Sequence, residues 1–125
     1  MIPSVKTFIA VGALVHRQLV AFTANDGEVT GATGDTDVLA GVVDFPSGAA
    51  DGERVDVVIF GPAEVICGGD ITPGAAFTSD ANGAAVAAAP VAGANAYTVG
   101  MLLANAASGD YARAFVQRGS MTGAA

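Results

Sequence analysis

Hydrophobic and polar residues alternate with a period of two near the middle of the chain. In residues 54–60, RVDVVIF, two valines and an isoleucine at every second position share one face, and Arg54 and Asp56 lie on the other. This alternation predicts a β-strand with one buried face. A Gly-Pro pair at 61–62 predicts a bend or an end of that strand, and the alternation resumes over residues 63–67, AEVIC.

Short apolar segments of the same kind recur along the chain between Gly, Asp, Asn and Pro residues, which favour turns. The alanine-rich segment 84–89 could form one helical turn, because alanine is the best helix former, but its length and Pro90 favour extended structure or a loop. The pattern predicts an all-β fold with little helix, a small barrel or sandwich of short strands. We expect the further strands at 5–11, within 14–22, and at 27–33, 38–43, 75–79, 84–89, 97–103 and 111–117.

Three features occur in the same order in both halves of the chain, which indicates an internal duplication. They are a Phe-Thr pair before a Gly-containing turn (22–27 and 77–83), an apolar strand around one glycine (Gly41 and Gly100), and a Gly-acid pair before the last strand (52–53 and 109–110). The alternative is that short strands and glycine turns resemble one another in any small β protein.

The duplication leads to a prediction of domain limits. We predict an N-terminal arm or first strand at 1–10, one β domain at 11–119 with pseudo-repeats at about 12–61 and 69–119, and a tail at 120–125.

The length and the net charge of the chain narrow the range of possible functions. The 125 residues, 52% of them hydrophobic, suit one domain with one core, and 6% aromatic residues imply a modest core that oligomerisation would supplement. Twelve acidic residues against five scattered basic ones give a net charge of −7, which disfavours nucleic-acid binding. No apolar run approaches the roughly 20 residues that cross a bilayer, and His16-Arg17 interrupts a faint likeness to a signal peptide at the start.

Candidate chemistry is sparse. Nucleophilic catalysis would have to use His16 or a carboxylate, and we expect His16 to be exposed or structurally hydrogen-bonded. The single cysteine, Cys67, excludes an internal disulfide and is predicted to be a buried, inert thiol. The carboxylates sit singly or in pairs in turns without the spacing of a calcium loop, so we expect them to cap turns. The chain is therefore predicted to be no enzyme and to use no metal or cofactor.

Two short patterns resemble motifs of other classes. GGDITPGAAF resembles the turn of biotinyl and lipoyl carrier domains, but these need a lysine at a hairpin tip, and the only lysine is Lys6 near the start. The tail QRGSMTGAA resembles weakly the glycine-rich phosphate-binding motif of trimeric dUTPases, with Arg118 and Gly119 as the candidate residues. A surface that binds saccharides or host cells is a further alternative, although the chain has no Trp for sugar stacking.

An ordered succession of short segments runs through the chain: GVV, GERVDV, AEV, GGDITPG, TSDANGAAV and VG. With the opening KTFIAVGALVHRQLVAFTANDGEV and the ending TVGMLLANAASGDYARAFVQRG, it covers nearly the whole chain and resembles the capsid decoration, or cement, proteins of tailed phages. The resemblance implies a β-rich subunit on the outer surface of the virion. Such a subunit binds the major capsid protein, commonly as a homotrimer at three-fold or quasi-three-fold positions, and braces the shell.

The resemblance carries no short binding motif. We predict that the N-terminal arm, through Ile2, Pro3, Val5 and Phe8, lies against the shell or a neighbouring subunit and adds backbone pairing at a sheet edge. The alternative is an arm that pairs only within its own barrel.

Overall fold

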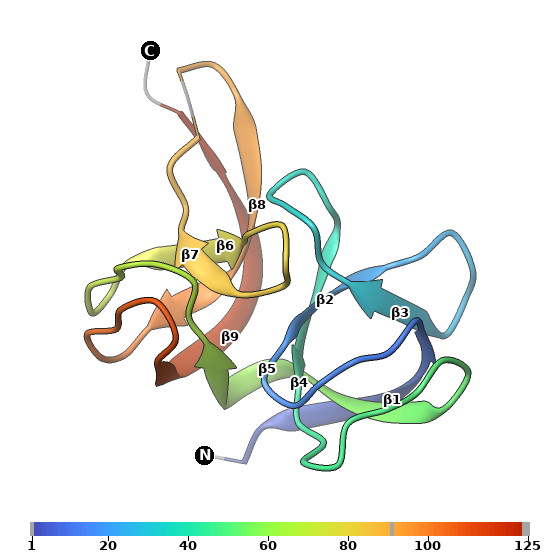
Figure 1. Ribbon diagram of the computed structural model, residues 1–125. Coiled ribbons are helices and arrows are strands. Elements are labelled where there is room, and N and C mark those ends of the chain that lie inside the picture. The colour runs from blue at the N-terminus through green and yellow to red at the C-terminus, as the bar shows by residue number, and fades with distance from the viewer. Residues whose placement is uncertain (1, 91, 124–125) are drawn as a thin grey trace.

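The computed structural model describes residues 2–90 and 92–123 and is built of β-strands and turns (Figure 1). None of the described residues is helical, so the prediction of an all-β fold is confirmed. The nine strands are β1 (Ser4–Val11), β2 (Leu19–Phe22), β3 (Glu28–Gly31), β4 (Leu39–Val43), β5 (Arg54–Ile66), β6 (Ala76–Ser79), β7 (Ala85–Ala87), β8 (Asn95–Leu102) and β9 (Tyr111–Thr122).

The first five strands close into a barrel. Its strands pair in the order β1-β3-β2-β4-β5, and β5 returns to pair with β1. The β1–β3 pair is parallel, and the other pairs are antiparallel. The side chains at every second position of β1 and β5 therefore point into one small interior.

The strand β5 is long because it serves two units. It pairs with β1 up to Phe60, opposite Ser4, and with β9 from Gly61, opposite Val116. Gly61 and the following proline therefore do not end the strand, as one reading of the sequence allowed; they mark the point where it passes from one unit to the next. Figure 1 shows β5 running between the two units, and the far ends of β8 and β9 projecting as a two-stranded ribbon.

The pairing scheme of the first unit recurs in the second. There β5 pairs with β9, β9 with β8, β8 with β6 and β6 with β7, each antiparallel, and a parallel bridge joins Cys67 to Ala85 where the first unit has its parallel β1–β3 pair. The bridge Leu14–Ala49 likewise recurs as Ile71–Ala106, displaced by the same interval along the chain. The two halves thus share one topology; the limits 12–61 and 69–119 stay a prediction.

Two groups of buried side chains form the core. One fills the first barrel and includes Phe8, Val20 and Val55. The other fills the second unit around Phe77 and extends to residues of the first unit such as Val58. The second group therefore joins the two units into one folded body.

Candidate functional site

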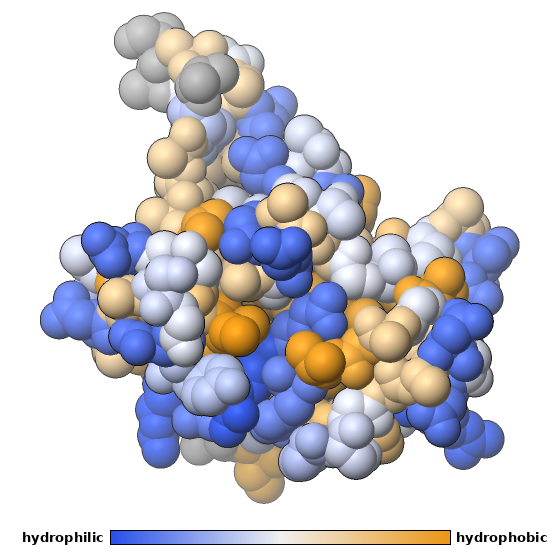
Figure 2. Space-filling view, viewed as in Figure 1, coloured by the Kyte–Doolittle hydropathy of each residue, from blue (hydrophilic) through white to orange (hydrophobic). Residues whose placement is uncertain are grey.

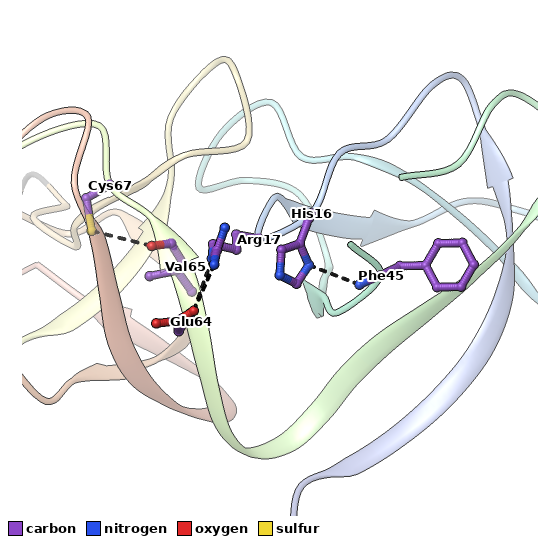
Figure 3. Close-up of polar contacts among 6 residues, drawn as sticks. All are labelled: His16, Arg17, Phe45, Glu64, Val65 and Cys67. Carbon is purple, nitrogen blue, oxygen red and sulfur yellow. Dashed lines mark hydrogen bonds and ion pairs between the residues drawn. The ribbon is translucent and has the colours of Figure 1, made fainter. Parts of the chain in front are cut away.

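The polar side chains that could take part in catalysis or hold the two units together make three separate contacts, His16 with Phe45, Arg17 with Glu64 and Cys67 with Val65 (Figure 3). His16 lies in the segment between β1 and β2, and its Nδ1 accepts a hydrogen bond from the backbone N–H of Phe45 at 3.1 Å. This contact confirms the structural role predicted for His16. With Nδ1 occupied in this way, His16 holds the β4–β5 connection in place.

Arg17, the next residue, ties the two units together. Its Nε and Nη2 both donate to Oε1 of Glu64, at 3.2 and 3.0 Å, and its guanidinium carbon lies 4.3 Å from the ring centroid of Tyr111. Arg17 adopts a φ of 73°, in the left-handed region that is strained for a side chain of this kind. Arg17 could not be predicted as a structural residue, because a positive φ at arginine has no signal in the sequence.

Cys67 is buried directly after the end of β5, and its Sγ lies 4.0 Å from the carbonyl oxygen of Val65 (Figure 3). Desolvation, and to a lesser extent the charge of Asp110, raises the pKa of the Cys67 thiol. The predicted burial of Cys67 is confirmed, and because a buried thiol with a raised pKa is a poor nucleophile, its inertness stays the expectation.

Several carboxylates accept hydrogen bonds from backbone N–H groups of their own turns, as the sequence predicted. Asp80 Oδ1 accepts from Asn82 and Ala84 at 2.8 and 2.9 Å, and Glu53 accepts from Ala50. Among the residues that the structure describes, no three His, Cys, Asp or Glu side chains form a group that could hold a metal ion. In the same part of the chain there is no helix that could cross a membrane.

The structure separates the four residues predicted to bind a partner. Ile2 is 90% exposed, and Val5 is 46% exposed on the outer face of β1. Pro3 packs over Gly61, and Phe8 points into the barrel and is buried. Strand β1 pairs within its own barrel; contact of these four residues with a shell or a neighbouring subunit stays a prediction.

A groove opens instead at one end of the first barrel. Its cavity measures about 730 Å³ and is lined by Lys6, Phe8, Phe22, Thr23, Ala24, Asn25, Asp26, Gly27, Ile59 and Arg118. The rings of Phe8 and Phe22 pack edge to face, with centroids 6.0 Å apart, and Phe22 is 39% exposed. The groove is thus an aromatic site that the sequence did not predict.

Two cations lie over these rings. Lys6 Nζ is 6.0 Å from the centroid of Phe8, and the guanidinium carbon of Arg118 is 5.5 Å from that of Phe22.

Arg118 and Gly119 are part of β9, where Gly119 pairs with Thr98. The two residues considered for a phosphate-binding loop therefore lie in a regular strand.

Figure 2 shows polar side chains over much of one face and apolar side chains gathered near its middle, between the two units. The acidic residues outnumber the basic ones by twelve to five over the whole chain. Against this background, the two cations of the groove stand out.

The fold defines a class: an all-β protein of two topologically equivalent units that share one long strand. A solved structure with a similar fold is the head fiber gp8.5 N base of bacteriophage phi29, with a TM-score of 0.67 and 19% sequence identity. The match covers 93% of this chain and 95% of that one. No family model matches the sequence, and no curated protein matches it either. The similarity establishes a shared fold.

Proposed function

We propose that the chain is a structural protein of a phage virion that attaches to the outer surface of the head and stabilises the shell. The observation that carries this proposal is the fold shared, over nearly the full length of both chains, with the phi29 head fiber gp8.5 N base. The sequence segments that resemble phage decoration proteins support the same role and point to the major capsid protein as partner. A net charge of −7 suits a position outside the shell, away from packaged nucleic acid.

The proposal includes a non-catalytic role. His16 and Cys67, the residues that a catalytic scheme would need, are engaged in a structural hydrogen bond and in the core. A subunit that is repeated over a shell can rely on many weak contacts, and a trimer would multiply them through avidity. We therefore propose a homotrimer at three-fold or quasi-three-fold positions of the shell.

The test uses heads of the phage that encodes the chain, prepared without it. Purified protein is mixed with these heads and sedimented, with heads of an unrelated phage as the control. We expect saturable co-sedimentation with the first heads only, and ordered density at three-fold sites in a reconstruction of the particles. Protein that stays in the supernatant with its own heads would refute the proposal. Light scattering of the free protein at several concentrations tests the trimer.

A further inference from the structure

The groove at the end of the first barrel borders an unpaired strand edge. Strand β1 pairs with β5 from Ser4 to Ile9, and with β3 only over Ile9–Val11. On that second side, none of the described residues pairs with the Ser4–Phe8 part of β1. Strand β2 ends at Phe22 and β3 begins at Glu28, and the connecting residues 23–27 line the groove beside this edge.

The free backbone groups of this edge can be assigned. The N–H of Ile9 donates to the carbonyl of Gly27 at 2.9 Å, on the side of β3. Backbone groups along a strand alternate between its two edges, so those of Thr7 and Val5 point to the same side as Ile9. They face the groove side with no strand beside them, which is the arrangement that accepts an added strand.

The side chains of the groove define what such a strand would carry. Phe22, which packs edge to face on the buried Phe8, offers an apolar floor, and Lys6 and Arg118 lie over the two rings. Within the described part of the chain, neither cation has an ion pair or a side-chain hydrogen bond, and Asp26 is the only acidic residue among the lining residues. Two unpaired cations in one groove of a protein with net charge −7 are complementary to carboxylates from outside.

We propose that this groove binds an extended acidic segment of a partner protein, which adds a strand to the Ser4–Phe8 edge. An apolar side chain of the segment packs on the exposed part of Phe22, and a carboxylate two positions along, on the same face, reaches Lys6 and Arg118. The inference rests on the proposed function only for the identity of the partner, which would then be the head protein. The apolar and cationic character of the groove follows from the structure and does not depend on the proposed function.

The test uses the full chain and two capped hexapeptides, TLTETE and TLTKTK, which differ only in the sign of their charges. Binding is followed by the shifts of backbone amide signals in nuclear magnetic resonance spectra. We expect TLTETE to shift the amides of β1 and of the 22–27 segment and TLTKTK to leave them unchanged. Equal binding of both peptides, or binding of neither, would overturn the proposal.

Variants separate the groove from general charge effects. The double variant Lys6→Glu with Arg118→Glu should weaken TLTETE binding at least tenfold. Arg54→Glu with Arg113→Glu changes the net charge by the same amount at exposed positions outside the groove and should bind like the wild type. Similar loss in both double variants would show a general charge effect and count against the groove.

A second pair of variants tests the strand edge. Thr7→Pro removes the N–H that faces the groove, and Thr7→Ala keeps it. We expect binding to be lost in the first and retained in the second, with circular dichroism as the check of folding. Because these measurements need no phage heads, failure of the head-binding assay and failure of the groove proposal are distinguishable.

Discussion

At the scale of single residues, Arg17 has the clearest structural role. Its ion pair with Glu64 is partly exposed and is worth little by itself, but the stacking on Tyr111 adds a second contact across the junction of the units. The strain of its positive φ opposes these gains. The loss of the Arg17 side-chain contacts and the relief of its backbone strain can be measured separately, by substituting Arg17 with alanine and with glycine.

We predict that Arg17→Ala lowers the free energy of unfolding by about 1–2 kcal/mol, because both contacts are lost and the strained φ remains. Arg17→Gly loses the same contacts but relieves the strain, so it should be about 1 kcal/mol more stable than Arg17→Ala. Urea unfolding measures both, with Arg113→Ala as the control cation. Equal stability of the alanine and glycine variants would contradict the role of φ.

Cys67 gives a prediction for pH. Its pKa is raised in the folded state, so the folded protein holds the thiol proton at pH values where the unfolded chain has released it. Stability from this group is fully present below the ordinary thiol pKa and declines as the pH rises past it toward the folded pKa. We expect the wild type to lose more stability than Cys67→Ala between pH 8 and about 10.5.

Thermal unfolding of both proteins across this pH range measures the difference in stability. The tyrosines and Lys6 are present in both proteins, so their contributions cancel in this difference. The native thiol should also react with Ellman's reagent only at the rate of unfolding. Rapid reaction of the folded protein, or parallel pH profiles, would contradict the burial of Cys67.

At the scale of elements, two equivalent glycines allow strands to approach closely. A Cβ at Gly41 of β4 would collide with the carbonyl oxygen of Val58, and one at Gly100 of β8 with that of Phe115. Both obstacles are backbone atoms of the neighbouring strand, so they cannot rotate away. The same close contact occurs in both units, which explains why Gly41 and Gly100 occupy corresponding positions in the two halves of the sequence.

We predict that Gly41→Ala and Gly100→Ala each lower the free energy of unfolding by about 2–3 kcal/mol, since the strands must separate to admit the methyl group. Gly34→Ala is the matched control, because a Cβ there meets no atom within 4 Å and its φ is not in the left-handed region. The control should change stability by less than about 0.5 kcal/mol. Chemical unfolding measures all three, and a loss as large in the control would exclude the steric explanation.

Most of the strands could be predicted, because segments with alternating or glycine-centred patterns form strands where the sequence predicts them. The segment 84–89 contains a short strand, β7 (Ala85–Ala87), and no helical turn. The groove could not be predicted, because Phe8 and Phe22 meet only through the parallel pairing of β1 with β3. Such register is a property of the closed barrel, and the sequence carries no local signal for it.

At the scale of the whole molecule, the shared core decides how the protein unfolds. Val58 lies in β5 next to Val57, yet Val57 belongs to the core of the first barrel and Val58 to the core that extends into the second unit. Because successive side chains of a strand face opposite sides, one strand contributes to both cores. Loss of either core therefore removes support from the other.

We predict a single unfolding transition, in which the calorimetric and van't Hoff enthalpies agree. Val58→Ala should lower the free energy of unfolding by about 2 kcal/mol, from lost burial and the cavity left behind. That loss should be the same at the amides of Val20 in the first barrel and Val99 in the second unit, as measured by hydrogen exchange. If the two units are independent, the substitution will instead lower protection in one of them and leave the other unchanged, and two transitions will appear.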